Sequence, residues 1–274
     1  FTKKTVSEKR SDLVKSGNVI GIVNILVIIS IGILTDIASP IWYLYNGIIG
    51  FTNGFLCAMI SFAFLPYFEG LFKITTSLGL LETANLNHPL LKKLMLNAPG
   101  TYQHSLMVAN LSEAAAEAIG ADVILTRIGA YFHDIGKMKR PIFFSENQFS
   151  TGNPHENLSP RMSKIIISAH PKDGVEMAQK FKLPQVLQDF MLEHHGTSLV
   201  SFFYDVAKQN QDDDANESLK EDFRYPGPKP STKESGILML ADATEAAIRS
   251  IDKPTLPKIE NLIDSKITRN LSQP

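Results

Sequence analysis

The sequence predicts an all-α protein in which two membrane-spanning helices precede a globular helical domain. Two long apolar stretches lie near the N-terminus, helical periodicity of mixed polarity follows them, and strand signals are scarce throughout. A chain of 274 residues is long enough for one sizeable domain and a smaller part, which agrees with this division.

The two apolar stretches run from Val19 to Leu34 and from Ile41 to Pro66. Each is close to the ~20 residues that cross a bilayer. The connector carries Asp36 and no Lys or Arg, whereas basic residues lie on both sides of the pair: Lys9, Arg10 and Lys15 before it, and Lys73, Lys92 and Lys93 after it. The positive-inside rule therefore predicts that both ends of the pair face the cytoplasm. A pair of buried core helices is the alternative, which the all-round apolar character of the first stretch disfavours.

These patterns divide the chain into three parts. We expect residues 1–17 to form a cytoplasmic flank, residues 18–72 to form two transmembrane helices, and residues 73–274 to form a cytoplasmic domain. Basic residues precede the first apolar stretch and no small-residue cleavage site follows it, so we expect a segment of a longer chain rather than a signal peptide.

The single cysteine, Cys57, excludes an intramolecular disulfide framework. A net charge of −1 gives no basic field for long nucleic acid, although a small anionic ligand is compatible with it.

Glycine and proline residues punctuate the polar part into helices of roughly 10 to 20 residues. The run from Gln209 to Asp222 is acidic and poor in apolar residues, so we expect a solvated or disordered loop there. A stiff, proline-rich turn at residues 226–230 precedes the last helical region, which contains Asp242 and Glu245.

Histidine and aspartate residues recur at the predicted helices and helix ends of this domain. The set comprises His104, His133, Asp134, His170, His194, His195 and Asp242. Neutral imidazoles with a few carboxylates suit Mn, Fe or Zn, whereas Mg and Ca prefer oxygen ligands. Seven ligands are too many for one tetrahedral zinc but match two octahedral metals that share one carboxylate. Because burial of so many polar groups without a metal would leave them unsatisfied, we expect a dinuclear metal site.

The adjacent residues His133 and Asp134 are central to this hypothesis. Neighbouring side chains on a helix point about 100° apart and can approach two metals from one side, so Asp134 is expected to be the bridging, catalytic carboxylate. We expect Gly136 to end that helix and Lys137 to act in catalysis by holding a substrate phosphate as a point charge. Each residue alone also has a plainer interpretation, because a lone histidine is more often a core or surface group and Asp134 could be a helix-terminal acid.

Three residues of the proline-rich segment are candidates for substrate binding. Arg224, Tyr225 and Lys229 combine a guanidinium, an aromatic ring and an ammonium in a rigid frame that suits phosphate and base recognition. A rigid connector is an equally open interpretation. Outside these sets, we expect His88 to be structural and His155 to lie at the surface, with a ligand contact as the alternative for His155.

The order of these residues resembles the HD superfamily of metal-dependent phosphohydrolases, and the flanking motifs are similar to those of its seven-transmembrane HD family. The motifs are APGTYQHS at 98–105, YFHDIGK at 131–137, ENQ at 146–148, HHGT at 194–197, FRYPGPKP at 223–230 and MLADA at 239–243. The Gly-Tyr-Pro signature of the related cyclic di-GMP phosphodiesterases does not follow His195, where Gly196, Thr197 and Ser198 stand instead.

The resemblance implies an HD-domain helical bundle with a dinuclear metal site that hydrolyses cyclic di-AMP to linear pApA at a bacterial cell membrane. It further implies that the residues matching His104, His133, Asp134 and Asp242 hold one metal, and that those matching Asp134, His170, His194 and His195 hold the other. Mn and Fe are the expected metals, the bilayer is an expected partner, and association into homo-oligomers stays open. Two alternatives remain: hydrolysis of cyclic di-GMP or another nucleotide, and a non-catalytic membrane receptor that senses a nucleotide.

Overall fold

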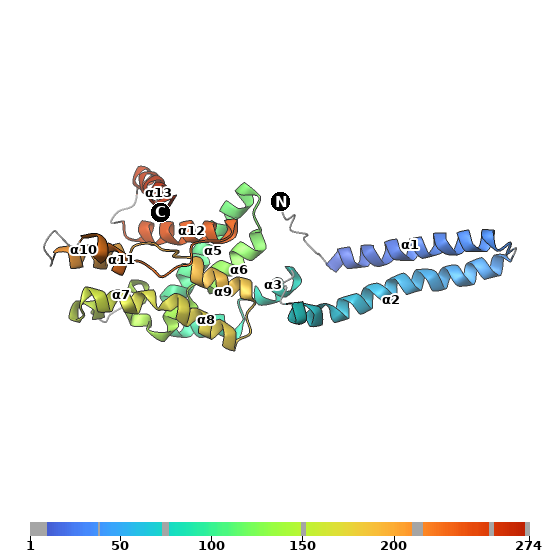
Figure 1. The fold of residues 1–274 in the computed structure, drawn as a ribbon, viewed down its shortest axis with the longest axis horizontal. Coiled ribbons are helices and arrows are strands. Elements are labelled where there is room, and N and C mark those ends of the chain that lie inside the picture. Colours follow the sequence, from blue (N-terminus) through green and yellow to red (C-terminus); the bar gives the residue numbers. More distant parts are fainter. Residues whose placement is uncertain are drawn as a thin grey trace. The chain divides into compact units, whose positions relative to one another are not determined.

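The computed structural model describes residues 10–37, 39–72, 77–148, 152–209, 216–251 and 255–271, and it divides the chain into two compact units, residues 1–79 and residues 80–274 (Figure 1). No β-strand occurs among these residues, so the all-α prediction is confirmed. Leu199 and Arg224 form an isolated antiparallel bridge. Lys9, Lys73 and residues 210–215, on which some sequence predictions rest, lie outside the described residues.

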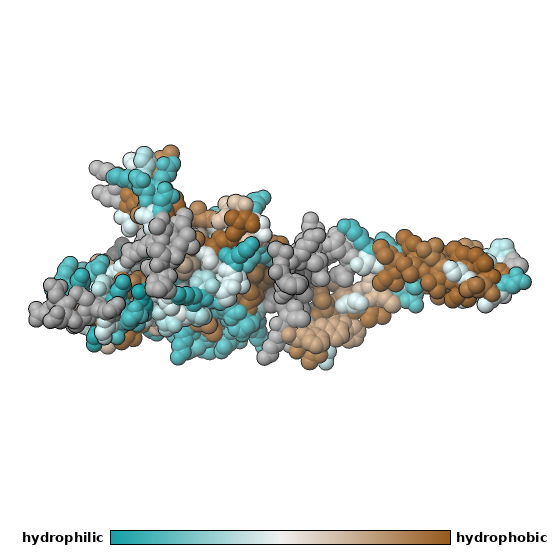
Figure 2. All heavy atoms as spheres, turned by 45° about the horizontal axis from the view of Figure 1, so that its top comes forward, coloured by the Kyte–Doolittle hydropathy of each residue, from teal (hydrophilic) through white to brown (hydrophobic). Residues whose placement is uncertain are grey.

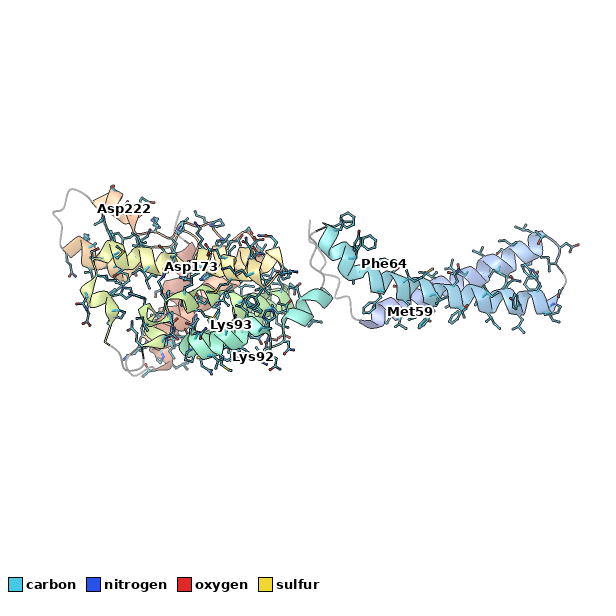
Figure 3. The ribbon with its side chains drawn as sticks, turned by 90° about the horizontal axis from the view of Figure 1, so that it is seen from below. Met59, Phe64, Lys92, Lys93, Asp173 and Asp222 are labelled. Atoms are coloured by element: carbon cyan, nitrogen blue, oxygen red, sulfur yellow. The ribbon has the colours of Figure 1, made fainter. Side chains whose placement is uncertain are left out.

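The first unit contains a long helical hairpin of α1 (Arg10–Leu34) and α2 (Pro40–Phe72). Stretches long and apolar enough to cross a membrane occupy Val14–Leu34 and Pro40–Leu65. Apolar side chains along both helices point outward, including Met59 and Phe64 at 56% and 53% exposure (Figures 2 and 3). Core helices of a soluble protein would bury such side chains, so the hairpin favours the membrane interpretation.

Small residues allow α1 and α2 to approach each other closely. A Cβ atom added at Gly54 would lie 2.4 Å from the backbone nitrogen of Gly21, so neither helix could carry a larger side chain there without separating. Asn24 adds a hydrogen bond between the helices, because its Nδ2 donates to the Gly50 carbonyl at 2.9 Å. Close backbone contact at small residues is a common way for membrane helices to associate.

The second unit is a bundle of short helices. Its helices are α3 (Ser77–Thr83, of which the unit includes the end), α4 (Pro89–Asn97), α5 (Pro99–Ile119), α6 (Val123–Phe132), α7 (Pro160–Ser168), α8 (His170–Lys180), α9 (Gln185–Glu193), α10 (Ser201–Gln209), α11 (Asn216–Asp222), α12 (Lys233–Arg249) and α13 (Leu256–Leu271). Four 3₁₀ turns, η1 (Ile135–Lys139), η2 (Pro141–Phe143), η3 (Ser145–Asn147) and η4 (Pro154–Asn157), lie between α6 and α7. The helix α5 packs against α4, α6 and α12, and α9 packs against α6, α8 and α12.

Side-chain caps fix where several of these helices begin. Asp122 accepts a hydrogen bond from the Leu125 backbone at the start of α6, and Thr232 forms a reciprocal capping box with Ser235 at the start of α12. His88 caps α4, because its Nδ1 accepts a hydrogen bond from the backbone N–H of Leu90. The apolar core between the helices is formed mainly by Leu90, Leu91, Leu94, Ile128, Phe132, Ile135, Leu187, Phe190, Met191 and Leu238.

The prediction of a solvated loop up to Asp222 is wrong for residues 216–222, which form α11. This mainly acidic segment contains an apolar pair with helical spacing. Leu219 and Phe223 are four residues apart, and both are buried, with Ala207 of α10, in a small second core. Packing against α10 therefore outweighs the polar composition of the segment.

Candidate metal centre

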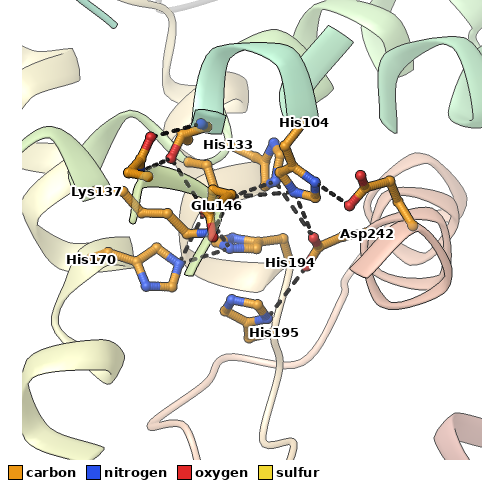
Figure 4. A network of polar contacts seen from close by, with 12 residues as sticks. His104, His133, Lys137, Glu146, His170, His194, His195 and Asp242 are labelled. Carbon is orange, nitrogen blue, oxygen red and sulfur yellow. Dashed lines mark hydrogen bonds and ion pairs between the residues drawn. The ribbon is translucent and has the colours of Figure 1, made fainter. Parts of the chain in front are cut away.

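Five helices bring the predicted ligands together in the second unit. His104 projects from α5, His170 begins α8, and Asp242 lies in α12. His133 and His194 stand in corresponding positions, each immediately after the last residue of its helix, α6 and α9. Figure 4 shows the imidazoles of His104, His133, His170, His194 and His195 around a common centre with Asp242.

The helix that precedes His133 ends earlier than expected. It ends at Phe132, not at Gly136, because Asp134 leaves the helical conformation with φ −107° and ψ 12°. Gly136 instead lies in η1 and allows a close contact with the start of α8, since a Cβ atom there would lie 1.9 Å from the His170 carbonyl oxygen. This contact keeps His170 beside Asp134.

The first group of ligands consists of His104, His133, Asp134 and Asp242, whose ligand atoms lie within 4.8 Å of one another. The Oδ2 atom of Asp134 is 3.5 Å from Nε2 of His104 and 3.2 Å from Nε2 of His133. Asp242 Oδ1 completes the group at 3.0 Å from His104 Nε2. All four side chains are buried.

The second group consists of Asp134, His170, His194 and His195. Here the other oxygen of Asp134 takes part, because Oδ1 lies 3.2 Å from His170 Nε2 and 3.5 Å from His194 Nε2. His195 is the most exposed member, at 21% of its side chain, and its ring stacks on Tyr225 with centroids 4.2 Å apart. The two oxygens of one carboxylate thus face two separate sets of imidazoles.

Hydrogen bonds direct the free nitrogens of three histidines into the centre. Nδ1 of His133, His170 and His194 is 2.7–2.8 Å from the carbonyl oxygen of the residue three positions earlier. Nδ1 must donate in such a contact, which leaves Nε2 as the atom that faces the aspartates. Fixing the tautomer in this way is typical of histidines that bind metals.

Several atoms at the centre are buried polar groups without a hydrogen bond to any described residue: His104 Nε2, His133 Nε2, and both carboxylate oxygens of Asp134. The oxygens of Asp134 lie at ion-pair distance from four histidines and from Lys137. Unsatisfied buried atoms are costly, and this set of nitrogen and oxygen donors suits divalent transition metals. The residues therefore fit metal binding.

The charges of the two carboxylates and of His194 and His195 suit ligation at neutral pH. Burial opposes ionisation of Asp134 and Asp242, but the surrounding histidines outweigh it and hold both carboxyl pKa values well below the usual range. Burial lowers the pKa of His194 to about 4, and it also lowers the pKa of His195. The carboxylates are consequently anionic, and these two imidazoles are neutral. For His133, burial is outweighed by Asp134 and Asp242, which raise the pKa to about 10, so metal binding at this imidazole would release a proton.

Lys137 lies beside the bridging aspartate. Its Nζ is 2.9 Å from Glu146 Oε1 (Figure 4). The same atom is 2.7 Å from Asp134 Oδ2 and lies over the Phe144 ring. Burial opposes the charge, but Asp134 and Glu146 outweigh it and raise the Lys137 pKa, so the ammonium stays charged. Glu146 is fixed in turn by Thr101, whose hydroxyl donates to the same carboxylate oxygen.

A cavity of about 630 Å³ opens onto these ligands. Lys137, Phe144, Tyr225 and Met239 line it, together with Phe202, which is 66% exposed. Arg224 and Lys229 line a neighbouring cavity of about 550 Å³, to which Tyr225 also contributes. Of the predicted substrate-binding residues, Lys137 and Tyr225 thus lie at the metal centre, whereas Arg224 and Lys229 lie next to it.

Two glutamates contact residues of the centre although no role was predicted for them, and His155 lies outside the metal cavity. Glu146 and Glu245 contact Lys137 and His104 respectively, although the sequence interpretation assigned neither a function. The only available signals were the ENQ motif and the spacing of Glu245 one helical turn after Asp242. His155 packs between Phe143 and Phe203 and is not among the residues that line the metal cavity.

A helical domain with two histidine–carboxylate groups that share one aspartate defines a metal-binding domain of the HD type. The chain belongs to the HD domain family, whose family model matches residues 101–247. A second family model, described as a 7TM receptor with intracellular HD hydrolase, matches residues 5–76. With the two apolar helices, this match identifies the chain as part of a membrane protein, and the predicted family is confirmed.

The curated relatives include two proteins named cyclic-di-AMP phosphodiesterase PgpH. The protein of Bacillus subtilis is 44% identical over 263 residues, and that of Listeria monocytogenes is 43% identical over 265 residues. These matches cover 96% and 94% of this chain but 36% of each relative, so the chain spans about a third of their length. An uncharacterized protein of Synechocystis is 43% identical over 77% of this chain and 26% of its own length.

Solved structures of the L. monocytogenes PgpH HD domain resemble the second unit. Their sequence identity to this chain is 48%, and they match 68% of it. One structure has a TM-score of 0.63 with 85% of that chain covered. The other, a complex with cyclic-di-AMP, has a TM-score of 0.65 with 86% covered.

Proposed function

We propose that this chain carries the hydrolytic domain of a membrane-bound phosphodiesterase that converts cyclic di-AMP to linear pApA. Two relatives that are more than 40% identical bear the name cyclic-di-AMP phosphodiesterase, and a solved HD domain that is 48% identical was crystallised with cyclic-di-AMP. The metal centre lies at the wall of a cavity whose size suits a nucleotide ligand.

The observation that carries the proposal is the position of Asp134, whose two oxygens face two different sets of histidines. His104, His133 and Asp242 would hold one divalent ion with Asp134, and His170, His194 and His195 would hold a second. Mn and Fe are the proposed native metals, because the donors mix imidazole with carboxylate. Divalent ions at such a site would lower the pKa of water, which supplies a nucleophile, and would neutralise the negative charge that develops on a phosphate.

The chain's own residues bind and orient the substrate. The charged ammonium of Lys137 lies on the cavity wall beside Asp134, where it can hold a phosphate oxygen of the scissile diester. Tyr225 and Phe144 enclose the centre with aromatic surface, which limits water around the reacting phosphate. Arg224 and Lys229, beside the cavity, are proposed to meet the distal part of the dinucleotide.

Membrane attachment completes the proposal. Residues 18–72 would cross the membrane twice in a multi-pass protein, with residues 1–17 and the domain at 73–274 in the cytoplasm, as the distribution of basic residues predicts. Association of the membrane helices into homo-oligomers is compatible with this arrangement.

Two other functions use the same residues and predict different outcomes. A hydrolase with another substrate would prefer cyclic di-GMP or a different nucleotide, because the bases are read by cavity residues outside the metal centre. A receptor would bind the nucleotide without cleaving it. The complete set of seven candidate ligands, in which hydrogen bonds direct Nε2 of three histidines into the centre, favours the enzyme.

The test is an activity assay on the full chain in detergent micelles, supplied with Mn or Fe(II). Cyclic di-AMP and cyclic di-GMP are compared as substrates, and products are followed by chromatography. We expect linear pApA from the wild type and none from Asp134→Ala, while Asp205→Ala, which removes an exposed aspartate of α10, stays active. Binding without cleavage under every metal would favour the receptor, and substantial activity of Asp134→Ala would refute the bridging role.

A further inference from the structure

The four histidines buried at the metal centre do not have equivalent partners. His133, His170 and His194 each direct Nδ1 to a neutral backbone carbonyl within their own chain segment. His104 instead directs Nδ1 to a carboxylate, Glu245 Oε2, at 2.5 Å. One of the two ligand groups thus contains a histidine with an anionic partner.

Glu245 is placed for this contact by α12. It lies one helical turn after Asp242, so a single helix supplies both a ligand of the first group and the partner of another ligand in it. The Glu245 side chain is only 5% exposed, and the contact spans α5 and α12, which pack against each other. A buried, charge-assisted hydrogen bond of this length holds the imidazole orientation firmly.

The negative charge is consequently unequal between the two groups. The first group contains Asp134 and Asp242 and has Glu245 behind His104, whereas the second shares Asp134 and otherwise consists of imidazoles, of which His195 lies 3.6 Å from Asp242 Oδ2. Lys137 lies close to the first group, but it is paired with Glu146 as well as Asp134, so this lysine and glutamate together add no net charge. Arg249 is 3.4 Å from Glu245 and offsets part of its negative charge, but 38% of the Arg249 side chain is exposed, so solvent screening keeps this offset incomplete.

We propose that the two metal positions differ in affinity, that the group containing His104 binds its metal more tightly, and that Glu245 is the positioning residue responsible. This inference rests on the metal centre of the proposed function. A carboxylate partner raises the basicity of a ligating imidazole and fixes its tautomer. The weaker position, formed by His170, His194 and His195, then fills and empties with the metal supply while the tighter one stays loaded.

The test is a calorimetric titration of the full chain in micelles with MnCl₂ after removal of bound metal. We expect two resolved binding steps in the wild type. Glu245→Gln should weaken the tighter step by about 10- to 100-fold and leave the weaker step unchanged. Glutamine has the same shape and can still accept a hydrogen bond, so a merely space-filling role would leave both steps unchanged.

A control variant and a second test variant accompany Glu245→Gln in the Mn titration. Glu234→Gln removes another carboxylate from α12, one that accepts a hydrogen bond from the Asp122 backbone, and should leave both steps as in the wild type. Should Glu245→Gln fail to fold, as judged by circular dichroism, Arg249→Gln provides the second variant and should tighten the same step. An unchanged or weakened step in Arg249→Gln would count against the proposal.

Two equal steps in the wild type, or equal weakening of both steps by Glu245→Gln, would overturn the inference and leave the proposed phosphodiesterase intact. Absence of any Mn binding would instead overturn the metal centre of the proposed function, and this inference with it.

Discussion

Replacing Gly136 with alanine tests whether the contact between η1 and α8 positions the metal ligands. The added Cβ would lie 1.9 Å from the His170 carbonyl oxygen and 2.5 Å from the Gly174 nitrogen. Because ordinary contact begins near 3.4 Å and both neighbours are backbone atoms, η1 and α8 must separate by about 1.5 Å. Overpacking of this kind costs about 1–3 kcal/mol or more, and a displacement of about 1 Å in a catalytic site can cost about 100-fold in rate.

Thermal melting and turnover of cyclic di-AMP are the assays for Gly136→Ala. We expect a lower melting temperature and a fall in kcat of about 100-fold, because the start of α8 carries His170. The matched control is Gly236→Ala in α12, where a Cβ would meet no atom within 4 Å and alanine should stabilise the helix by about 0.5–1 kcal/mol. Identical stability and turnover for the two variants would refute the argument that this close contact positions His170.

Three further predictions concern other contacts. Lys137 forms ion pairs with both Glu146 and Asp134, and Glu146→Gln removes the first of them, so kcat should fall about tenfold. The control Glu176→Gln removes an exposed partner of Lys139 and should leave kcat unchanged. Phe202→Ala removes an exposed aromatic ring from the cavity lining, so KM for cyclic di-AMP should rise more than kcat falls, as steady-state kinetics will show; an unchanged KM would exclude base stacking on this ring. Burial lowers the pKa of His88 in the folded state, so the unfolded state gains the proton first as the pH falls through the ordinary histidine range near ~6.5, and stability is lost in that range. His88→Asn keeps a cap acceptor that does not titrate, so its melting temperature should fall less than that of the wild type over the same range, and equal losses would contradict the role of His88.

Many elements of this protein could be predicted from local patterns. Apolar length predicted α1 and α2, because spanning a bilayer requires a minimum number of apolar residues irrespective of the rest of the fold. The candidate ligands were recognisable because imidazoles and carboxylates are rarely buried without partners, and the structure brings all seven together. Their assignment as metal ligands stays a prediction until metal binding is measured.

Contacts between distant segments could not be predicted in this way. Glu245 and His104 are 141 residues apart, so their hydrogen bond depends on how α5 and α12 pack, which no local spacing reveals. The same holds for the contact between Gly136 and α8, since a glycine after a helix is more commonly a helix end than a point of close packing. The helix α11 was missed because composition outweighed the spacing of Leu219 and Phe223 in the interpretation of that segment.

Asp134 is proposed to join two metal ions in one centre, and electron paramagnetic resonance of the full chain in micelles with two equivalents of Mn can detect such a pair. We expect a spectrum of two exchange-coupled ions, because the two oxygens of one carboxylate face the two ligand groups. The six-line spectrum of isolated, uncoupled Mn at full occupancy would contradict a shared aspartate and, with it, the proposed dinuclear centre.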